Sequence, residues 1–213
     1  MFTGLIESIC RVKSVSRSSS AMLLSIDLGE LADGTKTGDS IAVDGACLTV
    51  AGLDGRIARF DISPETLAKS NLGGLKPGLM ANAERAIKAD SRFGGHFVTG
   101  HIDGVATIKA INKQGEFADI KFAANAELLD QMVAEGSVAV DGISLTIANM
   151  DQISFSVAII PETLLKTTLG KAKVGDVVNI ENDIIVKTIK KELKKILPQK
   201  ENLTIEKLKE LGF

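Results

Sequence analysis

The sequence predicts an all-β protein, a tandem duplication of a small antiparallel barrel followed by a C-terminal α-helix. Three observations predict it: an internal repeat, hairpin signals at intervals of about ten residues, and an amphipathic Lys-rich segment after the repeat. The length of 213 residues would by itself fit one large domain or two small ones.

The repeat appears when the chain is shifted by 97 residues. SIAVDGACLTV returns as SVAVDGISLTI, and PETLAKSNLG returns as PETLLKTTLG. Without a gap, 21 of the 45 positions in residues 40–84 are identical to their partners in 137–181, which indicates a duplication. We therefore place a first unit at residues 1–88, a second at 89–186 and an unpaired tail at 187–213.

Each unit is predicted to be a barrel of short strands. Asp44-Gly45 and Asp141-Gly142 lie between runs of alternating apolar residues, which is the strongest short-range signal for a hairpin. The two Pro-Glu-Thr-Leu segments indicate one helical turn each, with Ser63 as a side-chain N-cap in the first copy only.

The tail is predicted to be helical. Ile185, Ile189, Leu193 and Ile196 form one apolar stripe opposite a Lys-rich face, and Pro198 ends the helix. A solvated face is the favoured interpretation of the lysines, with nucleic-acid or acidic-lipid contact as the alternative. The stripe must be covered, and a partner subunit is the preferred cover.

Composition excludes several classes. The chain has no Tyr and no Trp, and a net charge of −2 disfavours a nucleic-acid binder. Two Cys and two His cannot supply a disulfide framework or a four-ligand zinc site. No run of 18 apolar residues, no signal-peptide pattern and no GxGxxG, GxxxxGK[ST], HExxH or GxSxG motif is present. We expect a cytoplasmic protein with no metal, membrane or nucleic-acid partner.

Polar residues in equivalent positions of the two copies mark candidate sites. Cys47 and Thr49 share one strand face with Leu48 on the other, and Ser144 and Thr146 take the same positions in the second copy. These pairs suggest twin pockets that have diverged, although Cys47 taken alone is more often an ordinary core residue.

The two histidines lie in GGHFVTGHIDG. We expect His96 and His101 on one strand, pointing to opposite faces, which disfavours a shared metal. His101 adjoins Gly100, where backbone can approach a ligand, and could act as a general base or be an ordinary structural histidine.

With these residues identified, the chain resembles the riboflavin synthase family of the trimeric type. MFTGLIE, both VDGxxLT segments, both PETL…LG segments and GGHFVTGHIDG stand in the family's order, and the resemblance covers about Met1 to Ile196. It implies six-stranded antiparallel Greek-key barrels and the dismutation of two 6,7-dimethyl-8-ribityllumazine molecules. A four-carbon transfer gives riboflavin and 5-amino-6-ribitylamino-pyrimidinedione, with no metal or organic cofactor.

The resemblance also implies a homotrimer held by C-terminal helices, in which the first barrel of one subunit faces the second barrel of its neighbour. It places the lumazine contacts of the first barrel at Gly4, Leu5, Ile6, Cys47, Leu48, Thr49, Asp61, Ile62, Ser63, Pro64, Glu65 and Thr66. It places those of the second at Gly100, His101, Ile102, Ser144, Leu145, Thr146, Ala158, Ile159, Ile160, Pro161, Glu162 and Thr163.

The implied catalytic residues are His101, Ser144, Thr146, Cys47, Phe2, Asp141 and Asp183. His101, Ser144 and Thr146 would assist proton removal from the ring-seven methyl of the donor. Cys47 would serve the acceptor as nucleophile or as positioner.

Further implied roles lie around these groups. Phe2 would lie over the pocket mouth and Ser40 near the ribityl chain or ring, while Asp141 and Asp183 would orient their neighbours. Glu135 stands where family members commonly carry Lys, which puts one ligand contact in doubt.

Two other functions remain as alternatives. One is a non-catalytic lumazine- or flavin-binding protein on the same duplicated barrel, and the other is a purely structural barrel trimer. The polar residues kept in both copies favour the enzyme.

Overall fold

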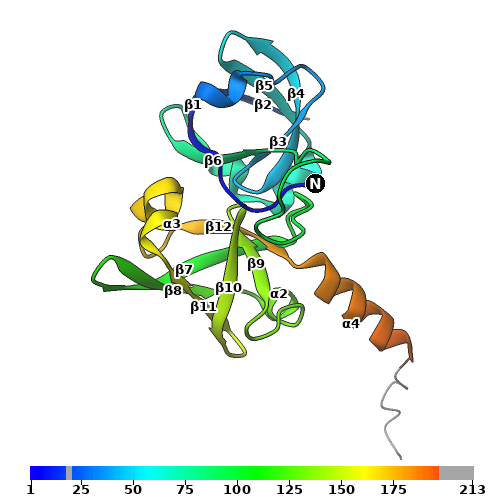
Figure 1. Cartoon of the computed structure of the whole chain (residues 1–213), viewed down its shortest axis with the longest axis vertical. Coiled ribbons are helices and arrows are strands. Elements are labelled where there is room, and N and C mark those ends of the chain that lie inside the picture. The colour runs from blue at the N-terminus through cyan, green and yellow to red at the C-terminus, as the bar shows by residue number, and fades with distance from the viewer. Residues whose placement is uncertain (18–20, 197–213) are drawn as a thin grey trace, which may run out of the picture.

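The computed structural model describes residues 1–17 and 21–196, which form two closed six-stranded antiparallel barrels in tandem and a C-terminal helix (Figure 1). The predicted fold class is confirmed. In Figure 1 the barrels lie one above the other, and the N-terminus lies between them.

The two barrels have the same strand order, β1-β2-β5-β4-β3-β6 in the first and β7-β8-β11-β10-β9-β12 in the second. The strands of the first barrel are β1 (Ser8–Arg17), β2 (Met22–Asp27), β3 (Ser40–Val43), β4 (Ala46–Asp54), β5 (Ile57–Ile62) and β6 (Met80–Arg85). Those of the second are β7 (Gly104–Gln114), β8 (Phe117–Ala123), β9 (Ser137–Val140), β10 (Ile143–Met150), β11 (Ser154–Ile159) and β12 (Val177–Asn182).

Short helices connect the strands, and a longer one follows the second barrel. They are η1 (Gly29–Ala32), α1 (Pro64–Lys69), η2 (Asn71–Gly74), α2 (Ala126–Leu129), α3 (Pro161–Lys166), η3 (Thr168–Lys171) and α4 (Ile184–Ile196). The predicted cap of α1 is confirmed, because the Ser63 hydroxyl accepts the Thr66 N–H while Ile160 offers α3 no side-chain cap.

The Asp-Gly turns close the hairpins β3–β4 and β9–β10, as predicted. Asp44 and Gly45 have φ of 43° and 82°, and Asp141 and Gly142 have φ of 43° and 79°. Two successive positive φ values define the type I′ turn, which suits the twist of a hairpin.

The two turns also join the barrels. A Cβ atom on Gly45 would lie 2.7 Å from the Gly142 backbone nitrogen, so the turns contact each other directly. The Asn82 side chain donates to the Asp141 carbonyl at 3.0 Å, and Asn179 donates to the Asp44 carbonyl at 2.8 Å. These reciprocal bonds give the barrels an approximate two-fold relation.

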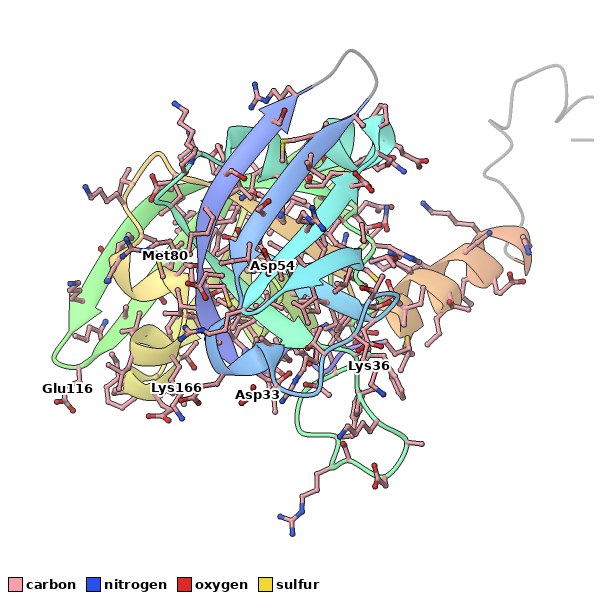
Figure 2. The ribbon with its side chains drawn as sticks, turned by 90° about the horizontal axis from the view of Figure 1, so that it is seen from above. Asp33, Lys36, Asp54, Met80, Glu116 and Lys166 are labelled. Carbon is pink, nitrogen blue, oxygen red and sulfur yellow. The ribbon has the colours of Figure 1, made fainter. Side chains whose placement is uncertain are left out.

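Helix α4 projects away from the barrels in both views (Figures 1 and 2). Ile185, Ile189 and Leu193 are exposed along it, so the predicted stripe is uncovered within one chain. None of the described helices has the length and apolarity needed to cross a membrane. Pro198, the predicted helix end, lies outside the described residues.

Three of the five lysines of α4, Lys191, Lys194 and Lys195, are exposed, as expected of a solvated face. Lys187 Nζ lies 2.8 Å from Asp103 Oδ1, and Lys194 Nζ lies 3.0 Å from Asp130 Oδ2. Lys190 donates to the Asp130 carbonyl and, at 3.0 Å, to that of Met132. Lys187 and Lys190 therefore attach the start of α4 to the second barrel, whereas Lys194 lies in an exposed ion pair.

Candidate functional site

A cavity of about 510 Å³ lies on the first barrel beside Cys47. It is lined by Ala46 and Cys47 of β4, by Glu65, Thr66 and Lys69 of α1, and by Gly100, His101 and Ile102. Cys47 is half-buried and Thr49 is exposed, whereas Leu48 between them points into the barrel core. The predicted sharing of one strand face is confirmed.

The segment that completes this cavity comes from the connection before the second barrel. The Cys47 N–H donates to the Gly100 carbonyl at 2.9 Å, and Ile102 packs into the first core. Gly100 has φ of +82°, and a Cβ atom on it would lie 2.4 Å from the Cys47 Cβ, so only glycine fits here.

The second barrel has an equivalent arrangement around Ser144. The Ser144 N–H donates to the Gly4 carbonyl at 2.8 Å, and Ile6 packs against the second core. A Cβ atom on Gly4 would lie 2.6 Å from the Ser144 Cβ.

The expected assignment of Gly4, Ile6 and Gly100–Ile102 to their own barrels is therefore wrong, whereas Leu5 lines a cavity of the first barrel. Gly4 and Ile6 contact the second barrel, and Gly100–Ile102 contacts the first. The repeat correctly pairs the segments with each other, but it does not tell which barrel each one contacts. Each segment crosses the interface between the barrels, so the two barrels exchange these segments.

His96 and Ser144 make a direct polar contact beside the second barrel. His96 Nδ1 lies 2.7 Å from the Ser144 Oγ, and the imidazole is only 8% exposed. Burial lowers the pKa of His96, and the charge of Asp183 opposes that effect without reversing it. A neutral imidazole beside a hydroxyl can accept its proton.

The expected strand through both histidines is not formed, since only Val98 makes a bridge there, to Phe2. The segment between the barrels instead carries His96 to Ser144 and His101 to Cys47. The sequence analysis assigns His96 no role, because residues 89–96 of the second unit have no equivalent in the first copy. The sequence feature that could have pointed to His96 is that the chain has only two histidines.

Phe2 was expected at a pocket mouth and is fully buried instead. It packs with Ala42, Val98 and Ala139 between the barrels, with Cys47 against this cluster. Phe2 is therefore a packing residue between the barrels that contacts the cluster beside Cys47.

Asp141 and Asp183 have different surroundings. The Asp141 carboxylate accepts the Asn179 N–H at 2.7 Å and the Asn71 side chain at 3.2 Å, at the interface between the barrels. It is not brought to His101 or Ser144 by these bonds. Asp183 accepts the Ile185 N–H at 2.8 Å at the start of α4, near enough to act on His96.

The remaining predicted contacts lie on the strand ends and loops. Of these residues, Ile62 and Ile159 are buried and Leu145 is half-buried. Exposed or half-buried at the surface are Leu5, Asp61, Ser63, Pro64, Glu65, Thr146, Ala158, Ile160, Pro161, Glu162 and Thr163. Glu135 is exposed, with φ of +63°, at the turn where the first copy has Gly38.

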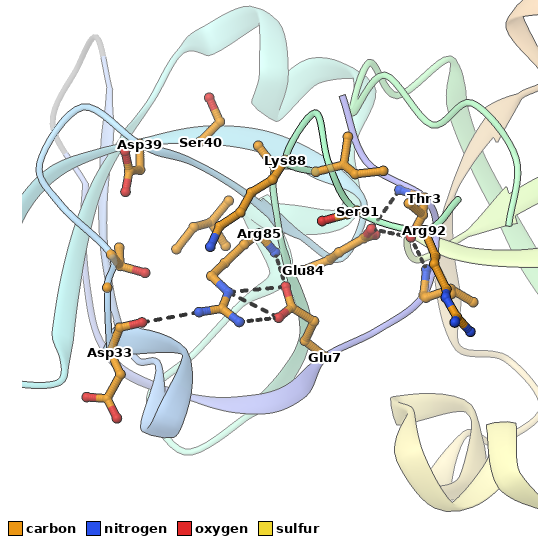
Figure 3. Close-up of a pocket in the computed structure, with 16 residues that line it drawn as sticks. Thr3, Glu7, Asp33, Asp39, Ser40, Glu84, Arg85, Lys88, Ser91 and Arg92 are labelled. Carbon is orange, nitrogen blue, oxygen red and sulfur yellow. Dashed lines mark hydrogen bonds and ion pairs between the residues drawn. The ribbon is translucent and has the colours of Figure 1, made fainter. Parts of the chain in front are cut away.

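Ser40 lines a second cavity, of about 520 Å³, on the first barrel (Figure 3). Ser40 is paired with Thr49 across β3 and β4, so it lies next to the strand that carries Cys47. Figure 3 shows Arg85 bound to Glu7 in this cavity, and Glu84 bound to Thr3.

The thiols differ in accessibility. Burial raises the pKa of Cys10 to about 11, so that thiol stays protonated inside the barrel. Cys47 is the thiol at the cavity. Within residues 1–17 and 21–196, no group of three or more His, Cys, Asp or Glu side chains is arranged to hold a metal ion.

Comparison with known proteins gives consistent matches. The lumazine binding domain family model matches residues 3–86 and 99–183. The riboflavin synthase of Actinobacillus pleuropneumoniae is 38% identical over 215 residues, covering 100% of both chains. That of Schizosaccharomyces pombe is 42% identical and covers 90% of this chain and 93% of its own.

A solved structure, LumP complexed with 6,7-dimethyl-8-(1'-D-ribityl) lumazine, superposes with a TM-score of 0.78. It is 22% identical and covers 85% of this chain and 99% of its own. At that identity the match supports the fold alone.

Proposed function

This chain belongs to the riboflavin synthase family, and we propose that it converts two molecules of 6,7-dimethyl-8-ribityllumazine into riboflavin and 5-amino-6-ribitylamino-pyrimidinedione. The observation that carries this proposal is the pair of equivalent sites with different reactive groups. One site presents Cys47 with His101, and the other presents Ser144 with His96. Two similar sites suit two identical substrates that play different parts.

The Ser144 site is suited to moving a proton. His96, neutral and 2.7 Å from the hydroxyl, would accept a proton through Ser144 from a lumazine methyl group. Asp183 would stabilise the imidazolium that results. Thr146, exposed on the same strand face as Ser144, would contact the ligand.

The Cys47 site would hold the second lumazine. Cys47 supplies a thiol, His101 a titratable ring and Thr66 a hydroxyl around one cavity. Neither a metal nor an organic cofactor is needed, because much of the rate would come from holding two planar rings face to face.

Bringing the two sites together would require neighbouring subunits, so we propose a homotrimer in which the first barrel of one chain faces the second barrel of the next. The exposed stripe of α4 supports this proposal, since Ile185, Ile189 and Leu193 are 49%, 55% and 46% exposed in one chain. In this proposal residues 187–213 serve assembly, while the barrels of 1–88 and 89–186 each carry one site that a segment of the other unit completes. A cytoplasmic location stays a prediction.

The direct test is to incubate the protein with 6,7-dimethyl-8-ribityllumazine alone and record riboflavin absorbance. We expect riboflavin to form. If the ligand binds but no riboflavin forms, a non-catalytic lumazine-binding protein is the correct description, a function that the LumP fold match also accommodates.

A further inference from the structure

Two buried glutamates hold the segments that are exchanged between the barrels. Glu84 of β6 is 4% exposed, and Glu181 of β12 is 2% exposed. They are equivalent in the repeat, and neither is paired with a cation in the described ion pairs. The hydrogen bonds of their carboxylates go to residues 3 and 4 from Glu84 and to residues 99 and 100 from Glu181.

The bonds of the two glutamates match atom for atom. Glu84 Oε1 accepts the Thr3 N–H at 2.6 Å and the Thr3 hydroxyl at 2.7 Å, and its Oε2 accepts the Gly4 N–H at 3.0 Å. Glu181 Oε1 accepts the Thr99 N–H at 2.7 Å and hydroxyl at 2.5 Å, and its Oε2 accepts the Gly100 N–H at 2.9 Å. A carboxylate is the only side chain that accepts on both oxygens in this way.

The threonine hydroxyls connect the two glutamates to the backbone of residues 5 and 101. The Thr99 hydroxyl, while donating to Glu181, accepts the His101 N–H at 3.3 Å. The Thr3 hydroxyl likewise accepts the Leu5 N–H at 3.2 Å. The position of the His101 backbone therefore depends on Glu181 through one hydroxyl.

Each glycine is held from two barrels at once. The Gly4 N–H binds Glu84 of the first barrel, while its carbonyl binds Ser144 of the second. The Gly100 N–H binds Glu181 of the second barrel, while its carbonyl binds Cys47 of the first. Figure 3 shows the Glu84 side of this arrangement.

We propose that Glu84 and Glu181 are positioning residues, each of which fastens, from its own barrel, the segment that completes the ligand site of the other barrel. Loss of Glu181 loosens Gly100 and His101 at the Cys47 site, and loss of Glu84 loosens Gly4 at the Ser144 site. The effect of each substitution thus appears in the opposite barrel. This inference takes its probe ligand from the proposed function.

The test uses Glu84→Gln and Glu181→Gln as matched controls for each other. Glutamine keeps the shape but offers one acceptor oxygen, so it cannot hold both the threonine and the glycine. The probe is 6,7-dimethyl-8-ribityllumazine. Occupancy of the first site is read from protection of the Cys47 thiol against iodoacetamide, since Cys10 is buried. Occupancy of the second is read from the NMR signal of the His96 ring, assigned with His101→Gln.

We expect Glu181→Gln to raise the apparent Kd at Cys47 about tenfold and to change the Kd at His96 less than twofold. Glu84→Gln should do the reverse. Equal effects of both variants at both sites, or effects confined to each glutamate's own barrel, would overturn the proposal. These outcomes are separate from the proposed function, which fails if wild-type protein forms no riboflavin.

If the glutamine variants do not fold, Thr3→Val and Thr99→Val remove one hydroxyl each at nearly constant shape. Each threonine variant is then expected to raise the apparent Kd about threefold at the site of the opposite barrel. No crossed pattern in the threonine variants overturns the proposal as well.

Discussion

The Nδ1 atom of His96 lies 2.7 Å from the Ser144 Oγ, so an imidazole from the connection between the barrels meets a hydroxyl on β10. His96→Gln should lower the rate of riboflavin formation about 10²-fold or more, because glutamine cannot accept a proton. The Kd for the lumazine should change less than about threefold, because His96 is only 8% exposed and we expect it to make no direct contact with the ligand. Steady-state rates and fluorescence titrations measure the two quantities.

Ser144→Ala is the matched variant for this pair. If His96 acts through the Ser144 hydroxyl, the double variant should be about as slow as the slower single one. If the rate losses of the two single variants multiply in the double variant, the two residues act independently.

Gly100→Ala should disrupt the first site. The left-handed backbone costs about 1–2 kcal/mol for a non-glycine residue, and a Cβ at 2.4 Å from the Cys47 Cβ must also displace β4. Gly34→Ala is the control, since Gly34 has φ of +81° but no atom within 4 Å of its Cβ position.

We expect both alanine variants to lower the free energy of unfolding in urea, and Gly100→Ala to lower it more. Only Gly100→Ala should weaken protection of Cys47 by ligand. Equal behaviour of the two variants would mean that strain in the backbone, and not the close approach, determines the result.

The acids at the interface between the barrels make stability depend on pH. Burial raises the pKa of Asp44 to about 7, and burial followed by the charge of Asp44 raises that of Asp141 well above its usual range. Between about pH 4, where an unfolded Asp titrates, and pH 7, the folded protein binds more protons than the unfolded chain. The contribution of this pair to the free energy of unfolding therefore falls as pH rises through that window.

Asp44→Asn should flatten this slope because it removes one of the two titrating carboxyls. The fold should tolerate the change, because an amide oxygen can still accept the Asn82 N–H that Asp44 Oδ1 binds at 2.8 Å. Urea denaturation at several pH values measures it. Asp54→Asn, at an exposed strand end, should leave the slope unchanged (Figure 2). A wild-type slope in the Asp44→Asn protein would contradict the prediction.

The proposed trimer depends on the stripe of α4. Ile189→Lys introduces a charge at a position that is 55% exposed in one chain and would be covered in the trimer. We expect dissociation into monomers by analytical ultracentrifugation. Ile153→Lys, at a site 73% exposed in the turn between β10 and β11, is the control and should keep the wild-type mass. A trimer that survives Ile189→Lys would remove α4 from the proposed interface.

The sequence was sufficient for the fold because each local signal agreed with the repeat. Asp44-Gly45 and Asp141-Gly142 make the predicted turns, and Ser63 caps α1 where Ile160 cannot cap α3. The equivalence of Cys47 with Ser144 also followed, because alternation along a strand needs no knowledge of the tertiary structure.

What could not be predicted depends on how the two barrels meet. Gly4 and Gly100 carry no sign of the barrel that they contact, because either could bind its own copy. Phe2 looks like a surface residue at a chain end, and only the interface between barrels buries it. His96 reaches Ser144 across 48 positions of sequence, a contact that no local pattern reports.

The exchange of Gly4–Ile6 and Gly100–Ile102 also sets the order in which the protein becomes competent during folding. The closing contacts join residues far apart in the chain, with Gly4 bonded to Ser144 and Thr99 bonded to Glu181. Contacts of such high sequence separation form late, after their loop-closure entropy has been overcome. The strands of the first barrel are all synthesised by residue 85, yet neither site is finished until β12 has formed and the barrels have docked. We therefore expect the two candidate sites to become complete together, once the barrels have docked.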